Sequence, residues 1–272
     1  MAPHNQVAHP APFDVIADQY DETFTDSMIG RAQRNSVWRE LKRTFHTGEH
    51  VLEIGCGTGV DACFLAGLGV RVTATDISTK MLDITDRRAM SHGVGELVRT
   101  RLLSAQDLLE LSRNGSFDGG FSNFGALNCI DDVARFAGDL AGVLRPGASA
   151  LLCWMGAYCA WETAFYLVQG NPGKAFRRWQ RGAVIGHVGA ETSVSVYYRS
   201  VRRLVKAFRP YFQLRSIKGI GITVPPSYLE GWATRHPYWL RASASADALL
   251  CGCPGVRSVA DHILLRFERE SL

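Results

Sequence analysis

The sequence predicts an α/β fold with a mostly parallel sheet, on the strength of three observations. Short apolar, β-branched runs typical of buried strands alternate with longer stretches of helical periodicity. The first of these strands, at residues 51–54, breaks into a glycine-rich turn, and the second, at residues 70–76, ends in Asp76. Repeated strand-helix units bring the carboxyl ends of parallel strands to one edge of the sheet, so we expect a binding site there.

The composition is that of a globular chain without a membrane span. Of the 272 residues, 46% are hydrophobic and 21% are charged, and no apolar run approaches the roughly 20 residues needed to cross a bilayer. The first residues lack the basic-then-apolar order of a secretory signal, so the predicted location is cytoplasmic. Seven scattered cysteines contain no Cys-x-x-Cys pair, which favours reduced thiols, and no cluster of carboxylates or histidines indicates a metal site.

The chain begins with a tail and a helical region ahead of the sheet. Residues 1–12 contain three prolines and nothing periodic, which predicts a frayed end. From Phe13 to Phe45 the apolar residues recur at helical spacing. We therefore divide the chain into an N-terminal tail and helical segment at 1–45 and a sheet domain at 46–272.

The glycine-rich turn after the first strand predicts a small ligand against the backbone. Glycines permit a sharp turn and a close approach that a Cβ would block. Dinucleotide sites favour Gly-x-Gly-x-x-Gly, with the pyrophosphate at the N-terminus of the following helix. Here the spacing is Gly-x-Gly-x-Gly, and Glu53 stands where it would repel a pyrophosphate. The turn therefore argues against a ligand with two phosphates.

The stretch Val51-Leu-Glu-Ile-Gly-Cys-Gly-Thr-Gly59 resembles motif I of the class I S-adenosylmethionine-dependent methyltransferases. The cofactor of that family carries a cationic sulfonium and an amino group in place of phosphates. The resemblance implies the Rossmann-like methyltransferase fold, with a seven-stranded, mostly parallel sheet. It also implies an N-terminal helical lid, in which Tyr20 of the segment Ala17-Asp-Gln-Tyr-Asp21 folds over the methionine part of the cofactor.

Further cofactor contacts follow from the ends of the later strands. Asp76 lies 23 positions after Glu53, where a carboxylate can accept both hydroxyls of a ribose. The resemblance assigns Ile77 and Met81 to the adenine walls, and the turn after the strand at 97–103 to the adenine edge. That turn reads Ser104-Ala-Gln-Asp-Leu108 where the family often has Asp-Ala-Glu-Asp-Leu, so either Gln106 or Asp107 would bond the adenine amino group. The predicted cofactor-binding residues are Tyr20, Glu53, Gly55, Cys56, Gly57, Gly59, Asp76, Ile77, Met81, Ala105, Gln106, Asp107, Ser122 and Asn123.

The rest of the chain supplies the remaining strands and two cap insertions. A strand that runs out into a loop over 117–125 and a helix at 131–144 precede a fifth strand at 148–154, and the pattern places the sixth at 211–219 or slightly beyond and the seventh at 261–268. The insertions occupy about 155–199 and about 222–260, after strands five and six. If strands five and six run parallel and seven antiparallel, as the resemblance implies, both insertions cover the ligand edge. Their many aromatic residues then predict an apolar wall suited to a small organic ligand.

Methyl transfer from a sulfonium requires the protein to position the acceptor and exclude water, because the cofactor supplies the electrophile. An acceptor nitrogen or oxygen must also lose a proton, and His187 in the first insertion is the predicted general base. His236 is an alternative in the second insertion, and His262 is predicted to be structural. Tyr158 and Tyr197 are predicted to orient the acceptor.

A basic stretch at 174–218 holds eleven Lys and Arg residues against one acid, Glu191. We interpret it first as the solvated side of helices, because Val201, Leu204, Val205 and Phe208 recur at helical spacing with cations between them. An anionic substrate, a membrane surface and nucleic acid are alternative partners for such a stretch.

The sequence therefore predicts an S-adenosylmethionine-dependent methyltransferase acting on a small, largely apolar or aromatic metabolite by N- or O-methylation, with S-adenosylhomocysteine as the other product. One alternative is a lipid-like or quinone substrate at a membrane surface, with peripheral membrane contact. RNA is a second alternative, disfavoured because no recognised nucleic-acid module is appended. A third is a non-enzymatic protein that only binds the cofactor.

Overall fold

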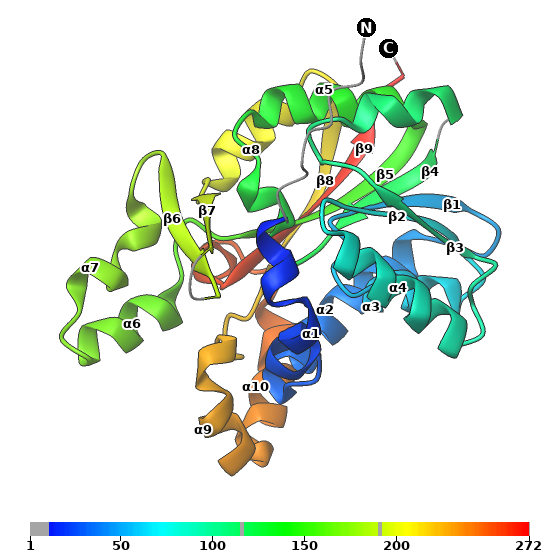
Figure 1. The fold of residues 1–272 in the computed structure, drawn as a ribbon. Helices are drawn as coiled ribbons and strands as arrows, with labels where there is room; N and C mark the ends of the chain where they lie inside the picture. The colour runs from blue at the N-terminus through cyan, green and yellow to red at the C-terminus, as the bar shows by residue number, and fades with distance from the viewer. Residues whose placement is uncertain (1–10, 115–116, 190–191, 272) are drawn as a thin grey trace, which may run out of the picture.

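The computed structural model describes residues 11–114, 117–189 and 192–271, which form a seven-stranded sheet between two layers of helices and a separate two-stranded hairpin (Figure 1). The strand order in the large sheet is β3-β2-β1-β4-β5-β9-β8. Residues 1–10 of the predicted tail and Glu191 of the basic stretch lie outside the described residues.

Five strands of the large sheet run parallel. They are β1 (His50–Ile54), β2 (Arg71–Asp76), β3 (Val98–Leu102), β4 (Phe117–Ser122) and β5 (Leu144–Met155). Strand β9 (His262–Arg269) lies antiparallel between β5 and β8 (Phe212–Ile220), so β8 runs in the same direction as β5. This arrangement confirms the predicted α/β fold with a seven-stranded, mostly parallel sheet.

Helices bury both faces of this sheet, which is why its parallel strands appear in the sequence as continuous apolar runs. On one face α2 (Met28–Thr44), α3 (Val60–Ala66) and α4 (Thr79–Ser91) pack around Val51, Val72 and Phe121. On the other, α5 (Val133–Val143) and α8 (Val201–Phe208) pack around a second core that includes Leu140 and Phe208. Helix α8 buries Leu204 and Phe208 and exposes its cations, which confirms the interpretation of this part of the basic stretch as a solvated helix face.

The N-terminal segment crosses the carboxyl edge of the sheet in short pieces. These are the 3-10 turn η1 (Pro12–Val15), α1 (Ala17–Tyr20) and the π-helical turn η2 (Asp21–Thr25), which lead into α2. Asp21 accepts a hydrogen bond from Thr58 Oγ1 at 2.7 Å and forms an ion pair with Arg88 on α4. These contacts hold the segment over the turn that follows β1.

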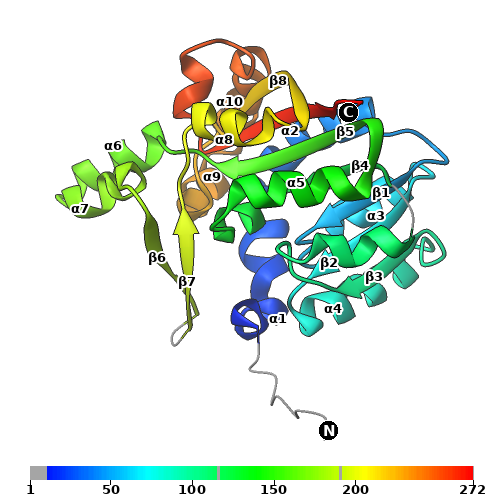
Figure 2. The same cartoon turned by 90° about the horizontal axis from the view of Figure 1, so that it is seen from above.

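The first insertion projects to one side of the sheet (Figures 1 and 2). It consists of α6 (Ala160–Val168), α7 (Pro172–Ala175), the short turn η5 (Arg177–Trp179) and the hairpin of β6 (Ala183–Val188) and β7 (Thr192–Tyr197). Its two ends lie side by side, because Gly156 and Arg199 form an isolated bridge. The hairpin was not among the predicted elements.

The second insertion packs against α2. It contains η6 (Ser227–Leu229), α9 (Glu230–Arg235), α10 (Pro237–Leu250) and η7 (Val256–Val259). The Glu230 carboxylate accepts the backbone N–H groups of Met28 and Ile29 at 2.7 and 3.0 Å, which satisfies two free donors at the start of α2. Within residues 11–114, 117–189 and 192–271, no helix is long and apolar enough to cross a membrane.

Candidate cofactor and acceptor site

A cavity of about 610 Å³ opens at the carboxyl ends of β1, β2 and β4, at the predicted edge of the sheet. Its walls come from the turn after β1, the N-terminal segment, the turn after β3, the short helix η4 (Ala126–Cys129) and the hairpin β6–β7. It brings together eleven of the predicted site residues: Tyr20, Gly55, Cys56, Gly57, Asp76, Ile77, Met81, Ala105, Gln106, Asn123 and His187.

The backbone of the turn after β1 faces the cavity directly. Gly55 has φ +69°, in the left-handed region that favours glycine, and a Cβ there would lie 2.3 Å from the Cβ of Ala126. Gly57 has φ +53° and faces the ring of Tyr20. Gly55 is therefore required for its backbone conformation and for lack of space, and Gly57 for its backbone conformation.

Asp76 lies at one end of the cavity with its carboxylate fixed by the backbone. One oxygen accepts the Gly57 N–H at 2.9 Å and the other accepts the Ser78 N–H at 3.0 Å. Burial raises the pKa of this carboxyl, and the two backbone N–H groups partly offset that effect. Since a carboxylate has about four lone-pair sites, each oxygen can still accept a hydroxyl.

A buried polar cluster lies at the other end of the part of the cavity lined by the turn after β1, which we call the cofactor side. Asp61 on α3 accepts hydrogen bonds from Arg34 Nη1 at 2.7 Å, Trp38 Nε1 at 2.6 Å and Asn123 Nδ2 at 2.9 Å. Burial lowers the pKa of the Arg34 guanidinium, but the adjacent Asp61 carboxylate outweighs it, so the pKa is raised. Arg34 and Asp61 were not among the predicted site residues, because neither stands in a recognisable motif.

Three polar atoms of this cluster are buried without a hydrogen-bond partner in the described part of the chain: Arg34 Nε, Asn123 Oδ1 and Glu53 Oε2. Burial, reinforced by the charge of Asp61, raises the pKa of Glu53 well above its ordinary value. Of these atoms, Arg34 Nε as a donor and Asn123 Oδ1 as an acceptor belong to residues of the cavity lining, and they suit a ligand that carries both a carboxylate and an ammonium group. The methionine part of S-adenosylmethionine carries both, so these residues fit that cofactor.

Four predicted cofactor residues do not line the cavity. Glu53 is 2% exposed and lies behind its wall, and Asp107 is exposed, with its N–H bonded to the Ser104 carbonyl. Gly59 faces α4, where a Cβ would meet Thr85 Cγ2 at 2.5 Å, and the Ser122 hydroxyl donates to the Ile54 carbonyl at 2.6 Å. These last two residues hold elements together.

The three predicted catalytic residues occupy different places. His187 borders the cavity with an exposed side chain. Tyr158 is 44% exposed and packs edge-on against Trp179, and the ring of Tyr197 lies 4.6 Å from the Arg199 guanidinium carbon. Neither tyrosine belongs to the cavity lining.

The insertions contribute to the cavity differently from the prediction. Among the described residues, the second insertion contributes none to the lining, because it packs on α2. The aromatic residues of the first insertion pack on one another, as in the contact of Tyr158 with Trp179, while Trp154 is buried in the sheet core. The expected aromatic wall is therefore wrong, and valines of the hairpin take its place.

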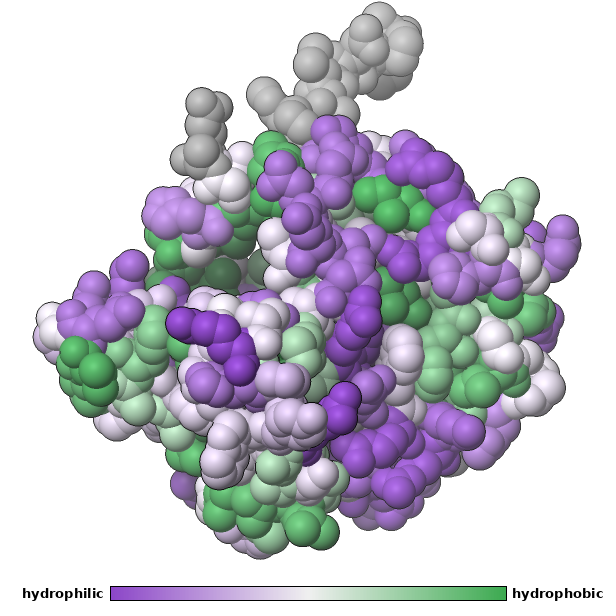
Figure 3. All heavy atoms as spheres, turned by 90° about the horizontal axis from the view of Figure 1, so that it is seen from below, coloured by the Kyte–Doolittle hydropathy of each residue, from purple (hydrophilic) through white to green (hydrophobic). Residues whose placement is uncertain are grey.

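The acceptor half of the cavity is apolar. It is lined by Pro12, Phe13, Ala126, Cys129, Ile130, Met155 and the hairpin. The charged lining residues among those the structure describes are Arg34, Asp61 and Asp76, all on the cofactor side, and none of the described cations of the basic stretch reaches the cavity. Figure 3 shows a hollow with apolar (green) walls on this face of the molecule.

Comparisons with known proteins agree with this geometry. A family model described as a methyltransferase domain matches residues 51–147. A demethylmenaquinone methyltransferase of Leptospira interrogans is 28% identical over 175 residues, which cover 61% of this chain and 70% of that protein. The chain is an S-adenosylmethionine-dependent methyltransferase whose methyltransferase domain includes residues 51–147.

Solved structures show the same fold. The CcbJ methyltransferase of Streptomyces caelestis has a TM-score of 0.62 at 16% identity, with 96% of this chain and 99% of that chain covered. A Listeria monocytogenes protein described as an S-adenosylmethionine-dependent methyltransferase has a TM-score of 0.61 at 17% identity, covering 87% and 98%. The family model contains the turn after β1, Asp76 and Asn123, whereas Arg34 and the hairpin lie outside it.

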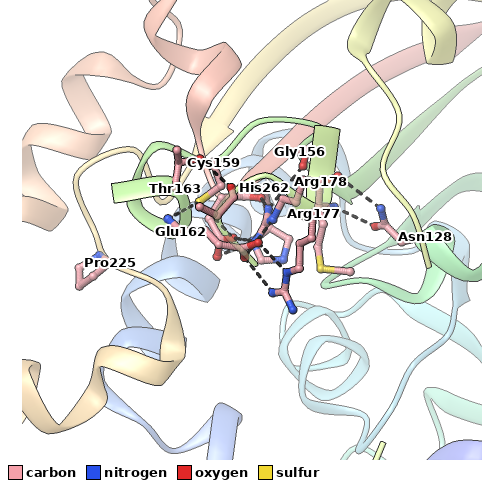
Figure 4. Close-up of polar contacts among 12 residues, drawn as sticks. Asn128, Gly156, Cys159, Glu162, Thr163, Arg177, Arg178, Pro225 and His262 are labelled. Atoms are coloured by element: carbon pink, nitrogen blue, oxygen red, sulfur yellow. Dashed lines mark hydrogen bonds and ion pairs between the residues drawn. The ribbon is translucent and has the colours of Figure 1, made fainter. Parts of the chain in front are cut away.

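A buried ion network ties the first insertion of this methyltransferase to its sheet (Figure 4). Arg178 donates to Glu162 Oε2 at 2.9 Å, to Asp261 Oδ1 at 2.8 Å and to the Asp261 carbonyl at 2.9 Å. Although burial opposes ionisation, His262 and Arg178 hold the pKa of Asp261 well below its usual range. His262 packs edge-on against Phe124 in the cavity wall, with the ring centroids 5.3 Å apart. The network therefore joins α6 and η5 to β9 beside the site.

Proposed function

We propose that this methyltransferase methylates a small, largely apolar or aromatic metabolite at nitrogen or oxygen. The observation that carries the proposal is that one cavity joins the polar cofactor side to an apolar compartment against the hairpin. Apolar walls with few polar groups suit a small organic ligand. The charges of Arg34 and Asp61 are paired with each other on the cofactor side, so an uncharged ring suits the acceptor side.

Each side of the cofactor pocket has a proposed role for its residues. Asp76 accepts the ribose hydroxyls, while Ile77 and Met81 pack on the adenine and Ala105 and Gln106 meet its edge. At the other end, Arg34 Nε donates to the carboxylate, and Asn123 Oδ1 accepts from the amino group. The bound cofactor supplies a methyl group on a sulfonium. Glu53 supports the wall from behind, and Tyr20 covers the methionine part.

His187 is the proposed general base. It is the imidazole that borders the cavity among the described histidines, and its exposed position places it at the rim. A neutral imidazole there can accept a proton from an acceptor that reaches that rim. Tyr158 and Tyr197 stay predictions for acceptor orientation.

A methyl-transfer screen tests this proposal. Purified protein is incubated with S-adenosylmethionine and a panel of phenols, aromatic amines and aliphatic acids, and mass spectrometry looks for the mass of one added methylene, about 14 Da. We expect gains on uncharged aromatic acceptors and none on aliphatic acids. Methylation confined to anionic aliphatic acceptors would contradict the proposal.

A lipid-like quinone is the second candidate substrate. The Leptospira relative is named for demethylmenaquinone, and the first insertion exposes apolar side chains next to cations. Val168 is 89% exposed and Trp179 is 55% exposed, and Lys174 and Arg181 are exposed beside them. Apolar and aromatic side chains interleaved with cations favour the surface of an anionic membrane.

Vesicle sedimentation distinguishes the second candidate from the first. We expect the protein to sediment with phosphatidylglycerol-containing vesicles at low salt and to be released as salt screens the cations. A variant that combines Val168→Ser with Trp179→Ser should lose this binding, whereas Met90→Ser, a matched exposed change on α4, should not. Absence of sedimentation at low salt would leave only the soluble-acceptor proposal.

A further inference from the structure

The two faces of the hairpin β6–β7 differ in exposure. On β6, Val184, Gly186 and Val188 are partly or fully buried, and Ile185 and His187 between them are exposed. On β7, Val194 and Val196 are covered, while Ser193 and Ser195 are exposed. Successive side chains of a strand point to opposite faces, so the valines and Gly186 share one face.

This inner face is a continuous apolar surface against the cavity. The register pairs Gly186 with Val194 and Val184 with Val196, which places these residues next to each other across the hairpin. Gly186, Val188, Val194 and Val196 all belong to the cavity lining. Strand β7 also contacts η1 and η4, which carry the opposite apolar walls.

Gly186 interrupts this surface, although its backbone conformation does not require a glycine. Its φ lies outside the left-handed region, so an L side chain could adopt the same conformation. A Cβ there would lie 3.0 Å from Val196 Cγ2 and 3.7 Å from Val194 Cγ2, which places it among the inner valines. Glycine inside a strand weakens it and often marks a close approach by a ligand. Here Val196 Cγ2 leans over the glycine, so a side chain at residue 186 would displace that valine in the cavity wall.

We propose that Gly186 sets the size of the acceptor ring, because it lets Val196 lean away from a planar, uncharged ring that packs on Val188, Val194 and Val196. The inference rests on the proposed function and adds the part of the wall that selects among aromatic acceptors. A side chain at residue 186 would push Val196 into the space that such a ring needs. A two-ring acceptor covers more of this wall than a one-ring acceptor, so its binding should suffer more.

The test compares Gly186→Ala and Gly186→Val with Ala183→Val, which adds similar bulk at an exposed position of the same strand outside the cavity lining. The probes are 2-naphthol and phenol, titrated calorimetrically into protein saturated with S-adenosylhomocysteine. We expect Gly186→Val to weaken 2-naphthol binding by at least about tenfold, in the range that one or two misplaced methyl groups produce in an apolar pocket. Gly186→Ala should have a smaller effect, and phenol binding should change less than threefold.

Two further measurements keep the outcome interpretable. Affinity for S-adenosylhomocysteine and the thermal midpoint report whether the variants are folded, and both should match the Ala183→Val control. Equal losses for phenol and 2-naphthol, no loss for either, or a wild type that binds neither probe would overturn the inference. If both probes bind as expected but no aromatic acceptor is methylated, the proposed function fails and the assignment of Gly186 to the acceptor wall stands.

Discussion

The turn after β1 and the hairpin β6–β7 line the same cavity, but different structures hold them in place. The turn joins a strand paired on both sides to a helix that packs on the sheet, and its conformation depends on Gly55 and Gly57. The hairpin belongs to a two-stranded sheet of its own. A two-stranded hairpin is marginally stable alone, so it depends on its contacts with η1 and η4 and on the ion network at its base.

The cofactor half and the acceptor half of the cavity also differ in the side chains that they present. The cofactor half presents charged groups with fixed partners, such as Asp61 with Arg34 and Asp76 with two backbone amides. The acceptor half presents valines and a glycine. On the proposed function, directional groups of the sheet domain bind the cofactor, and the shape of an appended element selects the acceptor.

The largest effect that we expect is on the free energy of unfolding, when the ion network that ties the first insertion to the sheet is broken. Arg178→Met leaves Glu162 and Asp261 buried without their cation, and we expect a loss of about 3–5 kcal/mol in the free energy of unfolding. Urea titration followed by circular dichroism measures it, with Arg181→Met, an exposed cation, as the control. A change below about 1 kcal/mol would show that the insertion is held by its apolar contacts instead.

Removal of the proposed base should affect turnover and leave the cofactor half intact. For an acceptor that is protonated at the assay pH, we expect His187→Gln to lower kcat about 100-fold or more, with unchanged affinity for S-adenosylhomocysteine. The loss should diminish as the pH is raised through the pKa of the acceptor, because the proton is then already gone. A loss that is small at every pH would assign proton removal to solvent.

Asp76→Ala tests the opposite half. Loss of the carboxylate should weaken cofactor binding by on the order of 1–3 kcal/mol, because the ribose hydroxyls lose their acceptor. Calorimetry measures the affinity, and Asp83→Ala, an exposed carboxylate on α4, serves as the control. Unchanged affinity would mean that the cofactor end of the cavity is wrongly assigned.

The smallest effect that we expect is on how the free energy of unfolding depends on pH. Burial raises the pKa of Glu53, so between its unfolded value of about 4.3 and its higher folded value the folded chain holds a proton that the unfolded chain has released. Raising the pH through this window therefore lowers the free energy of unfolding. Asp261, whose pKa is held low, has the opposite effect: it stabilises above an unfolded pKa of about 3.9, and that stability is lost in acid.

Glu53→Gln should remove the pH dependence that the Glu53 carboxyl gives to the free energy of unfolding. Its free energy of unfolding, measured with urea between pH 4.5 and 8 in the absence of cofactor, should rise relative to that of the wild type as the pH increases. A constant difference across this range would show that the Glu53 carboxyl ionises normally in the folded protein.

The cofactor half was predictable because its residues stand at fixed distances from strand ends. The turn after β1, Asp76, Ile77 and Asn123 all follow short apolar runs, and the structure places them together. Arg34 was missed because a buried arginine in a polar helix has no sequence pattern of its own. Gly59 and Ser122 belong to the same motifs, but their side-chain positions face packing partners, which only the coordinates reveal.

The acceptor half was less predictable for a different reason. The alternation of Val184, Gly186 and Val188 with exposed residues, repeated at Val194 and Val196, is a hairpin signal of period two. We instead expected the aromatic residues of the insertions to form the wall, and they pack on one another outside the cavity. Which apolar residues face a ligand depends on how an insertion docks, and no local pattern encodes that docking.

The bridge between Gly156 and Arg199 has an evolutionary consequence. An inserted segment whose two ends adjoin can be exchanged as a cassette, since the chain leaves and re-enters the parent fold at one point. Residues 157–198 carry the hairpin, whereas the turn after β1 and Asp76 lie elsewhere in the chain. We therefore expect that transplanting this segment between related enzymes would replace the hairpin side of the acceptor half and leave the turn after β1 and Asp76 as they are.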